Sequence, residues 1–453
     1  MKKILTILWF LLFSIFSANA AILGEVAMSS KALLRSIQPS CVNMVRAFSS
    51  MPPSLVDIRQ ERKTVRILAI DGGGIRSIIP LHILDRFETS LGRPIAHAFD
   101  IIAGTSSGGI AALALNRPKK GSENGQEHTP HYKAKEIYEL YLENKDKIFT
   151  KTQSLSDSIK LPFPLKYLIK KSFPQIGTLL NSPNVFRAKY PLEPLKEVFE
   201  TFFEDMPLSR SISTVVVPAY QIEHGRAYIF NSKTAKMDST DDYYMRDVAL
   251  ATSCAPTYFP PAEVWSISAS QLPEKARLAH TQCFVDGGIV ANNPTLFGYS
   301  TARRLFPAAT DFLIVSLGTG KGAVLKVPYD EVRKGGYAHW IHHIIPMLMN
   351  ASTESVGRVM HDLMEALHLA NPGAPFFPRH HDINPILPEH LVELDKASDE
   401  NVKDLQGRAD TTYRKLVEDK VIEKIVNELK EKRSYASGLD GNILVPEEDL
   451  QLR

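Results

Sequence analysis

The chain has 453 residues, 44% of them hydrophobic, which is enough to bury a large core. Its 53 basic and 50 acidic side chains nearly cancel, so the overall charge excludes a general affinity for nucleic acids. The three cysteines, Cys41, Cys254 and Cys283, lack the spacing of a zinc site and are too few for a disulfide framework, although a bridge between the last two stays open.

The N-terminus has the pattern of a secretory signal peptide. Lys2 and Lys3 precede a mostly apolar run at residues 4–16, and Ala18-Asn19-Ala20 places small residues where a signal peptidase requires them. Cleavage is therefore expected after Ala20, which predicts an exported chain that is secreted or periplasmic. An uncleaved membrane anchor is the alternative, but this run is short for a span of about 20 residues.

Regular alternation of strands and helices begins after an irregular lead-in at residues 21–60, which is rich in Ser and Pro. Short apolar runs bounded by turn residues predict strands, and the periodic or small-residue runs between them predict helices. The expected strands are 65–70, 99–104, 214–217, 226–230, 283–285 and 312–316, and the expected helices are 80–90 and 108–115. Strands separated by helices predict a mostly parallel sheet that is covered on both faces.

Two other parts of the chain depart from this alternation. Residues 117–190 are polar and rich in lysine, and they interrupt the pattern. Beyond residue 320 the pattern is mainly helical, with helices expected near 346–370 and 399–432. We expect residues 321–432 to pack on the core as a helical extension of the same unit, and residues 433–453 to form a loose tail.

A candidate nucleophile lies between the second expected strand and its helix. Gly104-Thr105-Ser106-Ser107-Gly108 fits G-x-S-x-G, in which small neighbours allow a sharp turn that exposes the serine hydroxyl. The N-terminal amides of the following helix point toward the same place and favour a developing negative charge. The alternative is an ordinary glycine-rich connection, but the strand before the turn favours a catalytic role for Ser106.

A glycine-rich loop, Asp71-Gly72-Gly73-Gly74-Ile75-Arg76, follows the first expected strand. Glycines have no Cβ, so the N–H groups of Gly72, Gly73 and Gly74 can approach one oxygen closely. Such a loop serves as an oxyanion hole in acyl transfer or as a phosphate cradle, and a flexible turn is the third interpretation. Arg76 is a candidate ligand for an anionic head group, or it braces the loop.

A candidate base follows the strand expected at residues 283–285. Asp286 is followed by Gly287 and Gly288, which leave room for another group to approach its carboxylate, and burial there would raise its pKa toward neutrality. The alternative role for Asp286 is an Asx turn or a helix cap. A histidine could complete a triad instead; the chain has fourteen, including His339, His342, His343 and His361, and none lies in a distinctive context.

These motifs, taken together and in this order, resemble the patatin-like phospholipase family over roughly residues 62–320, with looser echoes to about 410. The similar segments are Asp71–Arg76 (oxyanion-hole motif), Gly104–Gly108 (nucleophile turn), Ala251–Pro261, Asp286–Gly288 (catalytic aspartate motif) and Asp395–Ser398. Cys254 stands where the family usually has alanine. The resemblance implies a three-layer α/β/α fold, with residues 61–320 as the catalytic domain.

The resemblance also implies lipid acyl hydrolysis by a Ser–Asp dyad, without a metal or a cofactor. Ser106 then becomes the nucleophile, Asp286 the base and the glycine amides the oxyanion donors. We expect a hydrolase of the phospholipase A or lysophospholipase type, which cleaves a carboxylic ester of a phospholipid or another acyl lipid through an acyl-enzyme.

Two alternatives to this function remain. One is a non-catalytic binding protein that retains the fold. The more remote one is an ATP-dependent phosphotransferase, because Asp71–Gly74, Asp286–Gly288 and Gly318–Gly320 also resemble the phosphate loops of the actin and sugar-kinase group. That interpretation leaves the turn at Ser106 unexplained.

The stretch Leu161–Phe173 mixes lysines with large apolar side chains, which suits contact with an anionic membrane surface, although a segment folded onto its own protein has the same composition. Replacing Lys166, Lys170 and Lys171 with Glu is expected to weaken binding to anionic liposomes, because it reverses the attractive charge. Co-sedimentation measures the effect, and unchanged binding would leave only the second interpretation.

Overall fold

The computed structural model describes residues 64–121, 129–149, 188–307, 309, 311–322, 329, 333, 337–370 and 378–430. All of them belong to one compact unit, Lys63–Arg453. The signal peptide, the lead-in, the lysine-rich stretch at 161–173 and the C-terminal tail lie outside the described residues, so those expectations stay predictions.

The described strands form an eight-stranded sheet and a separate two-stranded ladder. The sheet contains β1 (Thr64–Ile70), β2 (Ile101–Gly104), β3 (Thr214–Gln221), β4 (Arg226–Asn231), β5 (Ala262–Val264), β6 (Gln282–Asp286), β7 (Asp311–Leu317) and β9 (Arg379–Ile383). The ladder pairs β8 (Lys321–Gly322) with β10 (Ile386–Leu387). Strands β9, β7, β1, β2 and β3 are parallel in this spatial order, as expected for strands joined by helices.

The longer described helices are α2 (Ile78–Leu91), α4 (Ser107–Asn116), α5 (Ala134–Ile148), α9 (Glu193–Phe203), α11 (Met245–Ser253), α15 (Thr295–Leu305), α17 (Tyr337–Ala370), α18 (Asp399–Glu418) and α19 (Val421–Lys430). The shorter ones are α3 (Ile95–Ala98), α10 (Ser232–Met237), α12 (Ile267–Ser270), α13 (Glu274–Arg277) and α14 (Gly288–Ala291). Among the described helices, none combines the length and the apolar character that a bilayer crossing requires.

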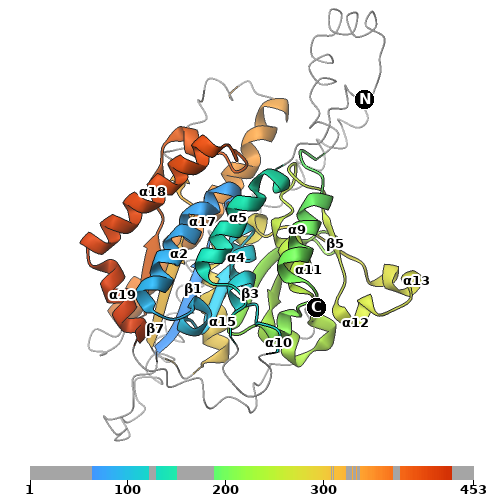
Figure 1. Ribbon diagram of the computed structural model, residues 1–453, viewed down its shortest axis with the longest axis horizontal. Helices are drawn as coiled ribbons and strands as arrows, with labels where there is room; N and C mark the ends of the chain where they lie inside the picture. Colours follow the sequence, from blue (N-terminus) through green and yellow to red (C-terminus); the bar gives the residue numbers. More distant parts are fainter. Residues whose placement is uncertain are drawn as a thin grey trace, which may run out of the picture. The chain divides into compact units, whose positions relative to one another are not determined.

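Helices cover both faces of the sheet (Figure 1). Successive side chains of a strand point to opposite faces, so β1 sends Leu68 and Ile70 to one side and Val65 and Ile67 to the other. Helices α2, α4, α5, α9, α11, α18 and α19 pack on the first side, and α15 and α17 pack on the second. The predicted three-layer α/β/α arrangement with a mostly parallel sheet is confirmed.

Two strands approach each other end to end along one edge of β3. Strand β4 pairs with residues 216–221 of β3 and fills one edge of that strand. On the opposite edge, β2 pairs with residues 214–216 of β3 and β6 pairs with residues 219–221 of β3. Strand β2 runs parallel to β3 and β6 runs antiparallel to it. The C-terminal ends of β2 and β6 therefore converge beside Val217 and Pro218, and whatever follows each strand meets there.

The C-terminal part differs from the helical extension that the sequence predicts. Residues 379–383 form β9, which adds an edge strand beside β7, so the extension is part of the sheet itself. The helix expected at 399–432 is two helices, because Lys420 between them has φ 57° and breaks the first one. Helix α17 begins nine residues before its expected start and continues through Pro346.

Cys254 and Cys283 are both free thiols, so the bridge left open between them does not form.

Candidate active site

Ser106 lies at the sharp turn between β2 and α4. Its backbone has φ 54° and ψ −127°, a region that residues with a side chain rarely adopt. A Cβ on Gly104 would lie 2.2 Å from the carbonyl oxygen of Gly108, and one on Gly108 would lie 2.3 Å from that of Ile70. Only glycine fits at these two positions, so the strained turn depends on the G-x-S-x-G pattern that the sequence shows.

Asp286 is the last residue of β6 and faces this serine. Ser106 Oγ donates a hydrogen bond of 2.8 Å to Asp286 Oδ2, and the Gly288 N–H donates one of 2.6 Å to Asp286 Oδ1. The serine is 6% exposed and the aspartate 3%. The structure thus brings together the two residues that the sequence indicates as nucleophile and base.

Burial raises the pKa of the Asp286 carboxyl from 3.8 to about 6, because loss of water disfavours its charged form. The hydrogen bonds from Gly288 and Ser106 lower the pKa, but by less than burial raises it. A carboxylate with a pKa near 6 accepts a proton more readily than an ordinary one, and it is still ionised at neutral pH.

Thr252 connects the two halves of this site. Its Oγ1 accepts a hydrogen bond of 3.0 Å from the Ser106 N–H and donates one of 2.7 Å to Pro218 O. Its carbonyl oxygen accepts from the Gly287 N–H at 3.1 Å. Thr252 belongs to the Ala251–Pro261 block, whose role the sequence does not reveal. Only the long-range contacts of the structure show that this threonine holds both segments.

The glycine loop after β1 has one free amide. The Gly72 N–H donates to Asn292 O at 3.0 Å, and the Gly73 N–H donates to Ser107 Oγ at 3.1 Å. The Gly74 N–H has no hydrogen-bond partner among the residues that the structure describes, and Gly74 lines the same pocket as the serine and the aspartate. Of the three predicted oxyanion donors, two amides hold the loop in place and one is available.

The loop around Gly74 is held by the C-terminal extension. Gly74 has φ 55°, and a Cβ there would lie 2.1 Å from the Leu394 carbonyl oxygen. That oxygen accepts a hydrogen bond of 2.8 Å from the Ile75 N–H, and the Tyr141 hydroxyl donates one of 2.5 Å to Gly74 O. The side chain of the next residue, Asp395, is 7% exposed and accepts hydrogen bonds from Lys189 and Tyr190. The echo of the family at Asp395–Ser398 therefore directly follows the residue that holds the glycine loop.

Arg76 contacts its own loop. Its Nε lies 3.5 Å from Gly73 O and its Nη1 lies 3.4 Å from Gly320 O, and the residue is 5% exposed. Burial lowers the pKa of Arg76 to about 10, and the nearby Asp71 carboxylate opposes this change. Of the two roles considered for Arg76, these contacts fit bracing of the loop and not recognition of a head group.

The serine and the aspartate open onto an apolar pocket. Its lining includes Ile110, Ile148, Phe149, Leu195, Phe259 and Met349. A second apolar pocket shares Ile110, Tyr141 and Ile148 with it and extends to Phe199 and Phe202. Among the described residues, no histidine lines either pocket. A continuous apolar lining of this kind suits a hydrocarbon chain.

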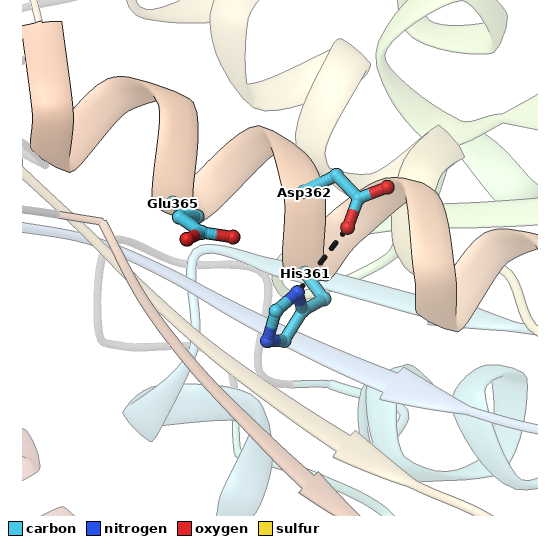
Figure 2. A group of neighbouring side chains, drawn as sticks. All are labelled: His361, Asp362 and Glu365. Carbon is cyan, nitrogen blue, oxygen red and sulfur yellow. Dashed lines mark hydrogen bonds and ion pairs between the residues drawn. The ribbon is translucent and has the colours of Figure 1, made fainter.

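The candidate third members of a triad lie elsewhere or are not described. His361 is exposed on α17, where its Nδ1 lies 3.3 Å from Asp362 Oδ1, and Figure 2 shows both beside Glu365. These three side chains could offer ligands to a metal, since their ligand atoms lie within 4.8 Å of one another, but all are exposed. Exposed charged groups on one helix face are ordinary, so this cluster supports no metal site. The side chains of His339, His342 and His343 lie outside the described part.

Fold and site together define a class of protein. It is a three-layer α/β protein in which a buried serine and a buried aspartate share a hydrogen bond beside an apolar pocket. A family model described as patatin-like phospholipase matches residues 68–297, and the chain belongs to this family.

Two relatives show how far the similarity extends. The chain is 32% identical over 328 residues to patatin-like protein 2 of Arabidopsis thaliana, which covers 67% of this chain and 73% of that protein. It is 30% identical over 303 residues to the cGAMP-activated phospholipase of Pseudomonas aeruginosa, and this match covers 66% of this chain and 74% of that protein. The predicted family is confirmed, and family membership supports lipid acyl hydrolysis as the general activity and a lipid as the substrate.

The raised pKa of Asp286 has a consequence for stability. Because the folded state binds this proton more tightly than the unfolded state, the stabilising effect is present below pH 4 and is lost as the pH rises through about 6. The rise from 3.8 to about 6 corresponds to roughly 3 kcal/mol at higher pH. Asp286→Asn removes the charge, so we expect this variant to be more stable than the wild type at pH 8, by about 1–3 kcal/mol.

Urea unfolding of both proteins at pH 4.5 and pH 8 measures this effect. The advantage of Asp286→Asn is expected to shrink at the lower pH, where the wild-type carboxyl is protonated. The buried Asp71, whose pKa burial also raises, is present in both proteins, so its contribution cancels in the comparison. An advantage that did not change with pH would contradict the assignment of the raised pKa to Asp286.

Proposed function

We propose that this chain is a serine acyl hydrolase of the phospholipase A or lysophospholipase type, with Ser106 as nucleophile and Asp286 as base. The observation that carries the proposal is the 2.8 Å hydrogen bond from Ser106 Oγ to Asp286 Oδ2, in a buried position that opens onto an apolar pocket. Nucleophile and base within hydrogen-bond distance are the geometric requirement for covalent catalysis.

In the first half of the reaction, Ser106 Oγ attacks the carbonyl carbon of the ester while Asp286 Oδ2 accepts its proton. The tetrahedral intermediate then collapses, the bond to the alcohol breaks, and the leaving oxygen takes the proton from Asp286. The fatty acyl group remains on Ser106 as an ester. In the second half, water attacks this ester and gives its proton to Asp286, and the fatty acid leaves as Ser106 Oγ recovers the proton.

The negative oxygen of the intermediate needs donors that are already in position. We assign this role first to the Gly74 N–H, because it has no hydrogen-bond partner among the described residues and belongs to a residue of the pocket lining. The Gly73 N–H can join it if Ser107 Oγ, its present acceptor, turns toward its other partner, Ser77. Gly72 has a structural role, since Asn292 O occupies its amide. One such donor contributes roughly 3 kcal/mol to catalysis.

The apolar lining argues against the phosphotransferase alternative. A nucleoside triphosphate requires free amides or cations around its phosphates. Here the Gly72 and Gly73 amides donate to groups of their own chain, and Arg76 contacts loop carbonyls. An acyl chain matches the side chains that surround the serine. A binding protein without turnover has the same pocket, so the two remaining functions differ only in reactivity at Ser106.

Replacing the nucleophile tests the proposal directly. Ser106→Ala is expected to reduce fatty-acid release from phospholipid by at least about 10³-fold and to abolish labelling by a fluorophosphonate, because Ser106 is the one hydroxyl paired with Asp286 in the described part of the chain. Mass spectrometry of a mixed lipid extract measures release and identifies the lipid that is cut. Ser300→Ala, at an exposed serine of α15, is the matched control and should behave as the wild type. Undiminished lipid cleavage by Ser106→Ala would contradict the assignment.

The pH dependence of the reaction reports on the base. Asp286 must be ionised to accept a proton, and its pKa is about 6, so kcat/KM is expected to fall about tenfold for each pH unit below that value and to level off above it. A profile of kcat/KM from pH 4 to pH 8 with a soluble ester measures this decrease at acidic pH. If substitution of a histidine removed the decrease, the result would instead indicate a triad.

A further inference from the structure

The N-terminal half of α17 exposes large apolar side chains on one face. Trp340, Ile344, Met347 and Leu348 are 37%, 47%, 39% and 47% exposed. Their spacing of four, three and one residues places them on the same side of a helix. We call these four residues the α17 face. Soluble proteins seldom leave such a group uncovered, so the face indicates an interaction surface.

The exposed side of the same helix changes character farther along. From Glu354 onward it carries charged and polar side chains, among them Arg358 and the cluster of His361, Asp362 and Glu365 that Figure 2 shows. Two separate apolar residues, Val359 and Leu369, are the exposed large hydrophobic side chains of this half, and they lie ten positions apart. One helix therefore has a solvated half and an apolar half, and only the apolar half requires a partner.

The opposite side of the apolar half belongs to the active site. Met349 is buried and lines the pocket that contains Ser106 and Asp286. One turn later, Ser352 Oγ accepts a hydrogen bond of 3.0 Å from the Asn292 N–H, and Thr353 lies 2.9 Å from the Asn292 amide nitrogen. The α17 face thus ends at Leu348, one residue before the wall of the pocket. In Figure 1 one end of α17 extends past the ends of the strands.

The composition of the segment indicates the partner. From Tyr337 to Thr353 the sequence contains no Lys, Arg, Asp or Glu, and the cations Arg333 and Lys334 that precede it stand next to Asp330 and Glu331, so the segment has no net positive charge. A helix with an apolar face and a tryptophan near one end is typical of a segment that lies in the surface of a bilayer. The described part of α17 is not a candidate membrane span.

We propose that the α17 face docks on a lipid surface and brings the pocket beside Met349 to the acyl chains of its substrate. This inference rests on the proposed function, because the pocket that it serves is the one around Ser106. A second copy of the chain on the α17 face would occupy the surface next to that pocket, whereas a lipid surface supplies what the pocket takes. Self-association is therefore an outcome of the test and not the proposal.

The double variant Ile344→Glu/Leu348→Glu of the full chain tests this proposal. It places two carboxylates on the α17 face, so we expect co-sedimentation with vesicles of phosphatidylcholine and phosphatidylglycerol, and hydrolysis of the vesicle lipid, to fall at least about tenfold. Turnover of a soluble short-chain ester, which needs no surface, should stay within about twofold of the wild type. Val359→Glu, the same change at a similarly exposed position in the charged half, is the matched control and should bind and cleave as the wild type does.

A second readout does not depend on an inserted charge. Trp340 fluorescence, taken as the difference between the wild type and Trp340→Phe, should shift to the blue when these vesicles are added, because the indole leaves water. Vesicle binding by the double variant equal to that of the wild type, or no shift of Trp340, would overturn the proposal. So would a wild-type dimer that the double variant converts to a monomer without loss of vesicle binding.

Failure of the proposed function would look different. If Ser106 were not the nucleophile, Ser106→Ala would still cleave lipid. Docking can be measured with the same variant, because co-sedimentation with vesicles requires no hydrolysis. Loss of the soluble-ester turnover in the double variant, together with that of vesicle lipid, would show damage to the pocket and would also contradict a docking role.

Discussion

Most of the site depends on how the segments that carry Ser106 and Asp286 share one edge of β3. Strand β2 arrives parallel to β3 and β6 arrives antiparallel, and both end beside Val217 and Pro218. Ser106, two residues after β2, and Asp286, the last residue of β6, are 180 positions apart in the chain, and their side-chain oxygens lie 2.8 Å apart. Only Val217 and Pro218 separate the part of β3 that pairs with β2 from the part that pairs with β6. The close approach is thus enforced by backbone hydrogen bonds of the sheet, not by the two side chains themselves.

Burial of this pair has opposite effects on stability and on reactivity. The apolar surroundings that raise the pKa of Asp286 destabilise its charged form, and they also make it a better proton acceptor. The positive φ of Ser106 adds backbone strain at the same place. The surrounding structure offsets both through Thr252, which binds the turn of Ser106 and the segment after Asp286, and through Gly288, whose amide binds the carboxylate.

The C-terminal extension contributes residues to this site. Leu394 fixes the glycine loop through its carbonyl oxygen, and Met349 of α17 forms part of the pocket wall. Strand β9 attaches the segment between them to the sheet. Helix α17 contacts Asn292 and lines the pocket, so the docking proposed for the α17 face would act on an element that already belongs to the site.

The amino-acid sequence by itself determined the local chemistry: the turn at Ser106, the glycine loop, the aspartate at a strand end and most of the core elements. These are readable because a strained turn excludes side chains and because apolar periodicity reflects burial within one element. The direction of β6, the strand β9, the free amide of Gly74 and the contacts of Leu394 and Thr252 were decided only by the tertiary structure. Each of them is a contact between segments far apart in the chain, and nothing in the local residue pattern specifies which distant group a backbone amide or carbonyl will meet.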